Sequence, residues 1–418
     1  MLEATSRRRG RRREQFQDRF LLHIQEATMQ IQKVSDTLTK FSLSSAENGF
    51  TVNLIASMGK DGILLVDTGW AHTAEELNKK IRELSDDTIK LIVLTHQHGD
   101  HIGGRNVLGK DATLIAHKNA KDELAGRYFA LDPLPGQELP LITLEDELSL
   151  RFNGEDIRII PAPGHTNSDI VVHFIDSCVA CMGDLLFSDS FPGLFPGWGC
   201  HIDQYLKAIN TLIDRFPPDI KLIAGHGRDY SLDDLKEHYQ MALSTTALIQ
   251  QSMADGKTPK EMIAENILKD WKKWGSAAIS SADWITQVFE SLTGTGKKPV
   301  AEPLTRTILE KGISAAINQY HELKKNQPDS FDFTENQLNM LGYQLLWRNM
   351  NEAAIEMHKL NTQIYPKSAN PYDSLGDAYE ASREVALAIE SYERALEIDP
   401  TMPSAIEALK RLGATGEN

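Results

Sequence analysis

Three of the 13 histidines in this chain fall within one short segment, Thr95-His96-Gln97-His98-Gly99-Asp100-His101. In an extended loop, residues two positions apart point the same way, so His96 and His98 can converge on one ion. The adjacent pair Asp100 and His101 can turn toward another ion. Imidazole and carboxylate ligands without a thiolate suit zinc, and also iron or manganese. The segment therefore predicts a metal centre.

Three further polar residues each follow an apolar run that we interpret as a strand, and each has a glycine beside it: His165, Asp184 and His226. One isolated histidine of this kind is usually a core residue. Three such positions in series, after the histidine-rich segment, favour a shared metal site instead.

The elements that must position these side chains form a mixed pattern from residue 29 to about residue 227. Helical stretches such as Ala74–Leu84 and Tyr205–Arg215 alternate with short apolar runs bounded by Gly, Asp and Pro. Those runs predict strands at Val52–Ser57, Ile63–Val66, Ile89–Leu94, Thr113–Ala116, Ile157–Ile160, Ile170–Phe174, Val179–Met182 and Leu222–Ala224. The alternation predicts an α/β fold whose sheets carry helices on their outer faces.

The order of the motifs adds a resemblance to a known family. His-x-His-x-Asp-His, followed by Gly-His, Gly-Asp and Gly-His-Gly, resembles the signature of metallo-β-lactamase-fold hydrolases over roughly residues 30–290. The resemblance implies an αβ/βα sandwich with a dinuclear metal site. It implies that the first metal is held by His96, His98 and His165, the second by Asp100, His101 and His226, and that Asp184 bridges both. It also implies that Asp67 supports the metal loop, with a capping carboxylate as the alternative.

The chemistry that this resemblance implies is hydrolysis. Two zinc ions ~3.5–4 Å apart can share a hydroxide that attacks an ester, thioester, lactone or lactam bond of a small-molecule substrate. Asp100 would take part in catalysis by orienting that hydroxide and relaying its proton. Asp184 resembles the glyoxalase II-like and lactonase-like branch of zinc hydrolases, because a true β-lactamase usually has Cys or Ser near that place.

Three other functions stay open on the sequence. The first is a true metallo-β-lactamase that hydrolyses β-lactam antibiotics. The second is a metal-dependent phosphodiesterase or ribonuclease, which shares the ligand set, although this acidic chain shows no basic insertion for holding RNA. The third is an interaction protein in which helical repeats carry the function and the metal site is vestigial, although the complete set of seven ligands argues against it.

A loop between two candidate ligands is rich in aromatic residues, Gly and Pro: residues 191–199, Phe-Pro-Gly-Leu-Phe-Pro-Gly-Trp-Gly. Gly and Pro make this segment a loop rather than a core helix. Phe195 and Trp198 are therefore predicted to line the substrate pocket. The alternative is a loop that packs on the surface of its own domain.

The chain is expected to divide into five parts: a basic, disordered arm (1–28), a catalytic domain (29–230), its helical extension (231–293), a linker (294–302) and a helical repeat module (303–418). The arm carries six arginines between positions 7 and 13. Its only apolar run, Phe20-Leu21-Leu22, is too short for the core of a signal peptide. The linker is marked by Gly294-Thr295-Gly296.

The last part of the chain repeats itself. Leu341 and Gly342 recur 34 positions later as Leu375 and Gly376, and the surrounding pattern resembles the tetratricopeptide repeat. The first copy departs from that pattern, with His358 where an aromatic residue is usual. We expect an all-α module that serves packing, self-association or a protein partner.

Composition excludes several classes of protein. The chain has 418 residues, of which 41% are hydrophobic and 25% charged, as in globular proteins. Its net charge of -15 argues against general binding of nucleic acid. No apolar run approaches the ~18 residues of a membrane helix, so we expect no membrane insertion. The sequence leaves the compartment open: as it stands it is typical of a cytoplasmic protein, and of a periplasmic one if the start is misassigned.

Overall fold

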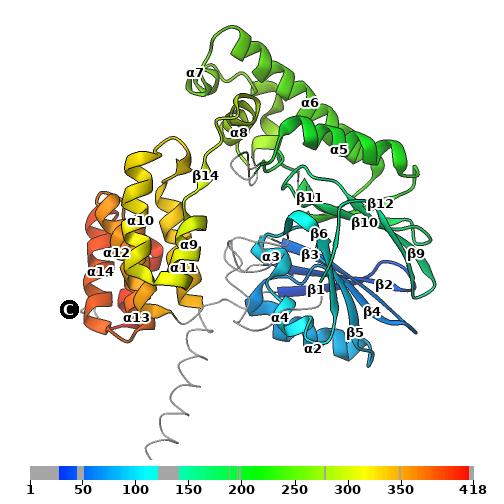
Figure 1. Cartoon of the computed structure of the whole chain (residues 1–418), viewed down its shortest axis with the longest axis horizontal. Helices are drawn as coiled ribbons and strands as arrows, with labels where there is room; N and C mark the ends of the chain where they lie inside the picture. The colour runs from blue at the N-terminus through cyan, green and yellow to red at the C-terminus, as the bar shows by residue number, and fades with distance from the viewer. Residues whose placement is uncertain are drawn as a thin grey trace, which may run out of the picture. The chain divides into compact units, whose positions relative to one another are not determined.

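The computed structural model describes residues 28–44, 51–120, 141–187, 189–194, 196, 199–276, 279–347 and 350–413. These residues form two compact units, one that ends at Gly296 and one that begins at Lys297 (Figure 1). The boundary falls inside the segment 294–302 that the sequence suggests as a linker. The predicted basic arm, 1–28, lies outside the described residues apart from Thr28.

The first unit contains a seven-stranded sheet whose strands follow one another in chain order. They are β1 (Thr28–Lys33), β2 (Leu38–Ser44), β3 (Thr51–Gly59), β4 (Gly62–Val66), β5 (Ile89–Val93), β6 (Thr113–His117) and β7 (Leu141–Leu144). The strands from β1 to β4 pair antiparallel, and those from β4 to β7 pair parallel. Because parallel neighbours need crossover connections, helices lie between these strands along the chain: η1 (Ala71–Thr73), α2 (Ala74–Leu84), α3 (Gly99–Ile102), α4 (Arg105–Leu108) and η2 (Lys118–Ala120).

A six-stranded sheet packs against the first one, in the order β13-β12-β11-β10-β9-β8. Its strands are β8 (Leu148–Phe152), β9 (Glu155–Pro161), β10 (Ile170–Phe174), β11 (Val179–Phe187), β12 (Lys221–His226) and β13 (Asp229–Tyr230). β11 and β12 pair parallel and are connected through α5 (Ile202–Arg215), whereas the other neighbours pair antiparallel.

Both faces of the second sheet are buried. Val172 and Ile223 belong to the core between the sheets, whereas their neighbours Val171 and Leu222 pack on the outer face with residues of α5. Since side chains alternate along a strand, burial on both faces produces the continuous apolar runs that predict these strands. The α/β sandwich with helices on its outer faces is thereby confirmed (Figure 1).

A group of helices continues the first unit after the second sheet. It comprises α6 (Leu232–Ala254), α7 (Pro259–Ala264), the 3-10 helix η5 (Lys269–Gly275) and α8 (Ser281–Thr293). Capping boxes open α6, α7 and α8, and each satisfies N–H groups that a first turn leaves unpaired. Trp284 of α8 is fully buried, and its ring N–H donates to the Thr245 hydroxyl of α6 at 2.9 Å. We call this group, residues 231–293, the helical extension.

The described part of the second unit is almost entirely helical. Its helices are α9 (Ala301–Lys311), α10 (Ile313–Asn326), α11 (Glu335–Trp347), α12 (Asn351–Ile364), α13 (Asn370–Ala381), α14 (Val385–Ile398) and α15 (Pro403–Arg411). β14 (Lys298–Pro299) and β15 (Phe331–Asp332) form a short parallel pair. α9 packs on α10, α11 on α12 and α13 on α14. Gly342 lies against His358 and Gly376 against Tyr392, so glycine permits the close crossing in each of the last two pairs.

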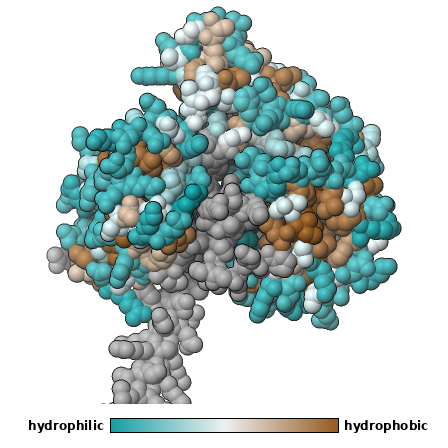
Figure 2. All heavy atoms as spheres, in the orientation of Figure 1, coloured by the Kyte–Doolittle hydropathy of each residue, from teal (hydrophilic) through white to brown (hydrophobic). Residues whose placement is uncertain are grey.

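Polar residues predominate on the face drawn in Figure 2, where hydrophobic residues form separate, smaller areas. Large exposed apolar side chains include Ile31 on β1 and Ile142 on β7, the two outermost strands of the first sheet. Within the described residues, no helix combines the length and the hydrophobicity that crossing a membrane requires.

Candidate metal centre

The predicted ligands come together from both sheets of the first unit. His96, His98, Asp100 and His101 lie on the loop after β5 and on the short helix α3, His165 follows β9, and Asp184 and His226 lie in β11 and β12. In the described part of the chain, ligand atoms within 4.8 Å of one another define two groups. The first group is His96, His98, His165 and Asp184, and the second group is Asp100, His101 and His226.

Asp184 lies between the two groups. Its Oδ2 is 3.5 Å from Nε2 of His165 and 3.7 Å from Nε2 of His96, both in the first group. The same Oδ2 is 3.2 Å from Nε2 of His226, and Oδ1 is 3.2 Å from Nε2 of His101, both in the second group. A single carboxylate therefore faces four imidazole rings.

Strand β11 runs further than the sequence predicts, so Asp184 lies within the strand rather than after it. The pairing of β11 with β12 shifts register on both sides of Gly183, whose φ is +52°. A shift of this kind is a bulge, which bends the strand and re-aims the next side chain. Glycine adopts the positive φ at little cost, and the bulge brings Asp184 to the histidines.

Backbone carbonyl groups orient two of the rings. Nδ1–H of His165 donates to the carbonyl oxygen of Gly193 at 2.7 Å. Nδ1–H of His226 donates to the carbonyl oxygen of Thr51 at 2.7 Å. Because a carbonyl oxygen can only accept, each ring carries a proton on Nδ1 and turns its Nε2 toward the other predicted ligands.

Asp67 contacts both the backbone of the loop after β5 and a predicted ligand. Its carboxylate accepts from the N–H of Thr95 at 2.7 Å and from the Thr95 hydroxyl at 2.8 Å. It also accepts from Nδ1–H of His101 at 2.8 Å. The φ of Asp67 is +65°, a left-handed conformation that Asp tolerates better than most residues. This conformation, at the end of β4, turns the carboxylate toward the loop.

His96 shows that the site fits a metal ion. The Thr95 hydroxyl donates to Asp67, so its oxygen can accept from Nδ1–H of His96, 3.1 Å away. Nε2 of His96 is buried and makes no hydrogen bond to any described residue. A buried polar atom of this kind needs a partner, and a metal ion among nitrogen and oxygen ligands supplies one. This donor set suits zinc, and iron or manganese as well.

The charge states of His96, His98 and Asp184 match those that metal ligands need. Burial lowers the pKa of His96 and that of His98 well below 6.5, which keeps both rings neutral. Burial alone would raise the pKa of Asp184, but the rings of His226, His101 and His96 hold it well below 3.8. Neutral imidazoles beside an ionised carboxylate are the forms that bind a divalent cation.

His101 differs from its neighbours because three carboxylates surround it. Burial lowers its pKa, but Asp184, Asp100 and Asp67 together raise the pKa of His101 well above 6.5. The surplus of negative charge at this ring favours a cation, whether a proton or a metal ion.

One protein family matches the part of the chain that carries the candidate metal centre. The family described as the metallo-beta-lactamase superfamily matches residues 51–228, a range that contains all seven predicted ligands. The chain contains a metallo-β-lactamase superfamily domain. The resemblance inferred from the order of the motifs is thereby confirmed.

The similar proteins named here share 20–27% of their aligned residues with this chain. A β-lactamase-like protein 2 homolog of Caenorhabditis elegans is 24% identical over 60% of this chain and 94% of its own length. A type 2 metallo-β-lactamase of Bacillus cereus is 27% identical, with 43% of this chain and 66% of its own length covered. A hydroxyacylglutathione hydrolase of Gloeobacter violaceus is 26% identical, with 46% and 75% covered. A solved metallo-β-lactamase from Pontibacter korlensis, 20% identical, covers 51% of this chain and 99% of its own with a TM-score of 0.44.

Asp169 is a buried residue of the metallo-β-lactamase domain that sequence reasoning missed. Its carboxylate accepts from the N–H of Gly164 at 2.9 Å, from the N–H of Thr166 at 2.7 Å and from the Thr166 hydroxyl at 2.9 Å. These bonds close the turn that carries His165. Burial raises the pKa of Asp169 to about 6. The spacing Thr-x-x-Asp is the signal that could have revealed it, since such side chains commonly bond to nearby backbone.

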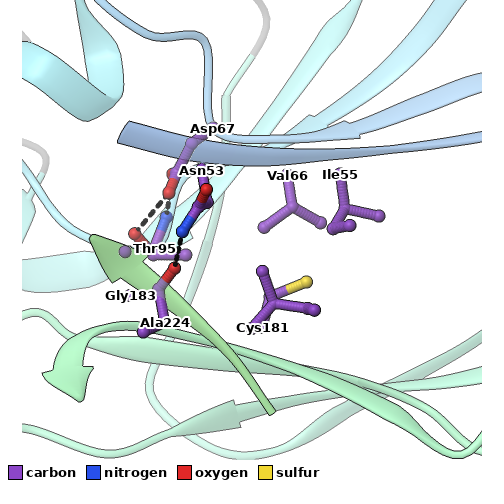
Figure 3. Close-up of a pocket in the computed structure, with 10 residues that line it drawn as sticks. Asn53, Ile55, Val66, Asp67, Thr95, Cys181, Gly183 and Ala224 are labelled. Atoms are coloured by element: carbon purple, nitrogen blue, oxygen red, sulfur yellow. Dashed lines mark hydrogen bonds between the residues drawn. The ribbon is translucent and has the colours of Figure 1, made fainter. Parts of the chain in front are cut away.

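A small cavity lies beside Asp67, between the two sheets of the domain (Figure 3). Asn53, Thr95 and Cys181 line it, and Nδ2 of Asn53 donates to the carbonyl of Ala224 at 3.0 Å. Its volume of about 10 Å³ admits no more than a single water molecule. The cavity is therefore too small to be a substrate pocket.

Two glycines near the ligands differ in the room around them. A Cβ at Gly225 would lie against the Asp184 carboxylate and 3.0 Å from Cε1 of His101. A Cβ at Gly99 would meet no described atom within 4 Å. The approach of β12 to Asp184 thus requires glycine at position 225, whereas packing does not require it at position 99.

The two predicted pocket residues, Phe195 and Trp198, lie outside the described residues, so their role stays a prediction. Phe191 and Leu194 of the same segment are buried, and they pack in the core that includes α5 and α8. The beginning of this segment therefore lies inside the first unit.

Proposed function

We propose that this protein is a metal-dependent hydrolase that binds two zinc ions and cleaves an acyl bond of a small molecule, which is an ester, thioester, lactone or lactam. The position of Asp184 carries the proposal. Its two oxygens lie within 3.7 Å of Nε2 in rings of both ligand groups. Two metal ions held close together are a recurrent means of activating water for hydrolysis, and one carboxylate can contact both.

The first group would hold one ion and the second group the other, with Asp184 in contact with both. When bound, the two ions supply a water of lowered pKa and a Lewis acid for the carbonyl oxygen of the substrate. Zinc is our proposal for the metal, with iron and manganese as the alternatives that the ligand set admits. Metal analysis of protein purified without added metal distinguishes them.

Asp100 is the residue that we expect to handle the proton. Its side chain is 19% exposed, whereas that of His101 is fully buried. Its Oδ2 lies 3.4 Å from Nε2 of His226 and 3.7 Å from Nε2 of His101. As the most exposed member of the second group, it is accessible to water and substrate. Its carboxylate can accept a proton from the attacking water and return it to the leaving group.

The similar proteins support hydrolysis at an acyl carbon. Their printed names include hydroxyacylglutathione hydrolase, for a relative 26% identical, and metallo-β-lactamase, for one 27% identical. Both names refer to the opening of a bond at an acyl carbon. The β-lactamase relatives favour a second candidate function, which is hydrolysis of β-lactam antibiotics.

Two assays of zinc-loaded protein test these functions. The substrates are a hydroxyacylglutathione thioester and a chromogenic cephalosporin, each with and without a chelator. We expect chelator-sensitive turnover of the thioester and little turnover of the cephalosporin, because true β-lactamases usually lack an aspartate like Asp184 and have Cys or Ser near that place. Fast turnover of the cephalosporin would favour the second candidate.

A matched pair of variants controls both assays. His96→Ala removes a predicted ligand, and His321→Ala removes an exposed histidine of α10 in the second unit. Only His96→Ala should abolish turnover. Protein that binds two zinc ions but hydrolyses neither substrate would contradict acyl hydrolysis and favour a phosphodiester substrate. Protein that binds no zinc would favour an interaction protein built on the helical repeats.

A further inference from the structure

A single peptide unit joins the metal centre to the helical extension. The carbonyl oxygen of Gly193 accepts from Nδ1–H of His165 at 2.7 Å. The N–H of Leu194, which belongs to the same peptide unit, donates to Oε1 of Gln287 at 3.1 Å. Gln287 lies on α8, outside the range 51–228 that matches the metallo-β-lactamase superfamily.

The geometry of a peptide unit makes this connection rigid. The unit is planar and trans, so its C=O and N–H point in opposite directions. Gln287 on one side and His165 on the other therefore fix the rotation of the same plane. A hydrogen bond accepted by Gln287 also polarises the peptide and strengthens its carbonyl as an acceptor for the His165 ring.

Further contacts hold the preceding residues against the helical extension. The hydroxyl oxygen of Ser190 accepts from the N–H of Ile279 at 3.1 Å. The N–H of Phe191 donates to the carbonyl of Trp274 at 2.9 Å, and its ring stacks on that of Trp284 with centroids 5.6 Å apart and planes 8° apart. Segment 190–194 is thus fixed to the extension at both ends, with Gln287 as the contact nearest to His165.

Burial leaves the peptide few alternatives. Leu194 is 1% exposed, so its N–H cannot turn to bulk water if the bond to Gln287 is lost. A buried N–H without an acceptor is costly, and rotation of the peptide toward another acceptor would relieve it. Such a rotation would also turn the Gly193 carbonyl away from His165.

We propose that Gln287 is a positioning residue of the metal centre. By holding the Gly193–Leu194 peptide, it keeps the proton of His165 on Nδ1 and directs Nε2 to the first group. The helical extension is then a working part of the centre, although it lies outside the matched family range. This inference rests on the proposed function, because it requires that the first group binds a metal ion.

Three variants of full-length protein test the proposal by zinc affinity, measured in competition with a chromogenic chelator. Gln287→Met keeps the length of the side chain and removes the acceptor. Gln287→Glu keeps an acceptor for the Leu194 N–H. Thr286→Val is the matched control, because among the described residues the Thr286 hydroxyl bonds only to the carbonyl of Ala282, within α8.

We expect Gln287→Met to weaken binding of one of the two zinc ions by ~10-fold, the lower end of the usual effect of losing a direct partner of a ligand, because Gln287 acts through the Gly193 carbonyl. Binding of the other ion should be unchanged, and Gln287→Glu and Thr286→Val should resemble the wild type. With cobalt in place of zinc, only Gln287→Met should alter the visible absorption of one ion. Unchanged affinities in Gln287→Met, or equal loss at both ions, would overturn the proposal.

A measurement on wild-type protein needs no folded variant. Spectra of ¹⁵N-histidine-labelled, zinc-free protein, with His165 assigned by His165→Gln, report which ring nitrogen carries the proton. We expect the proton of His165 on Nδ1, and a proton on Nε2 would overturn the proposal. Failure of wild-type protein to bind zinc would instead overturn the proposed function, so the two failures are distinct.

Discussion

Two regions of the molecule bury histidine, with opposite results. In the candidate metal centre, His101 is buried among carboxylates that raise its pKa well above 6.5 against the effect of burial. At the crossing of α11 and α12 in the second unit, His358 is buried against Gly342. Neither ring nitrogen of His358 makes a hydrogen bond to a described residue, and burial lowers its pKa to about 3.

The neighbours of a buried histidine, rather than its burial, therefore decide what the ring can bind. A ring surrounded by apolar atoms excludes a cation, whereas a ring beside several carboxylates invites one. The sequence already separates the two cases. His101 stands next to Asp100 in a cluster, whereas His358 occupies a repeat position whose counterpart 34 residues later is the buried Tyr392.

Of the substitutions considered, Asp184→Ala should have the largest effect on zinc binding and hydrolysis. It removes the carboxylate that four imidazole rings face, so the Nε2 atoms of those rings lose the negative charge beside them. We expect zinc content after dialysis to fall from two ions to one or none, and hydrolysis to fall by more than ~100-fold, beyond the effect of losing a supporting residue. Asp203→Ala is the control, because the Asp203 side chain, on α5, is 70% exposed. Two retained zinc ions and a full rate would show that Asp184 is not a ligand.

Asp67→Asn should have a smaller effect and acts on one ligand group. Asn keeps the size of the side chain but offers His101 a neutral acceptor, so the ring loses one of the charges that raise its pKa. We expect one zinc ion to bind ~10–100-fold more weakly. Asp61→Asn is a suitable control, since Asp61 accepts the N–H of Asn153 at the turn between β3 and β4. Equal zinc affinities in Asp67→Asn and wild type would contradict a role for the charge.

His358→Phe tests the buried histidine of the second unit through the pH dependence of stability. The pKa of His358 is about 3 in the folded state and ~6.5 in the unfolded state. Below pH 6.5 the unfolded chain therefore binds a proton that the folded chain excludes, so stability is lost as pH falls toward 3. Relative to wild type, His358→Phe should gain about 1.4 kcal/mol in unfolding free energy between pH 7.5 and pH 5.5.

Urea titration of the full chain at the two pH values measures this gain. Asp373 has a pKa raised to about 6 by burial and so contributes with the opposite sign over part of this range. It is present in both proteins, so the difference between variant and wild type isolates His358. A variant that follows the wild type at both pH values would show that His358 is protonated in the fold.

Much of the fold of the first unit follows from its sequence, and the exceptions have physical reasons. The predicted strands overlap strands of the two sheets, because burial on both faces gives continuous apolar runs. β2 escapes prediction because Lys40 and Ser42 interrupt its pattern. Both are buried with polar partners, since Lys40 pairs with Asp229 of β13 and the Ser42 hydroxyl donates to Asn53 of the neighbouring strand β3 at 2.7 Å.

In the second unit, the repeat signal weakens toward its beginning. Before the two copies, Ala316, Tyr320, Leu323 and Pro328 form only a partial copy of the repeat pattern, at a different spacing. The structure places α10 there and packs it against α9, whose first two residues fall inside the segment 294–302 suggested as a linker. α9 and α10 therefore form a helical hairpin, and the spacing of residues in this segment does not reveal it.

Part of the candidate site can be predicted from the sequence and part of it cannot. Side chains that could bind a metal are visible as His and Asp at the ends of apolar runs, and the structure brings all seven together in two groups. The acceptors that orient His165 and His226 are carbonyl groups of Gly193 and Thr51. Every residue has a carbonyl group, so sequence alone could not have marked these two.

The glycine between Ala224 and His226 also sets a limit on how this protein can diverge. Even alanine at position 225 would press on the Asp184 carboxylate, so descendants that keep the centre should keep this glycine. A Cβ at position 99, inside the histidine-rich motif itself, meets no atom of the described residues, so packing among these residues sets no such limit there. Packing therefore limits substitution less at position 99, inside the histidine-rich motif, than at position 225, which lies 126 positions further along the chain.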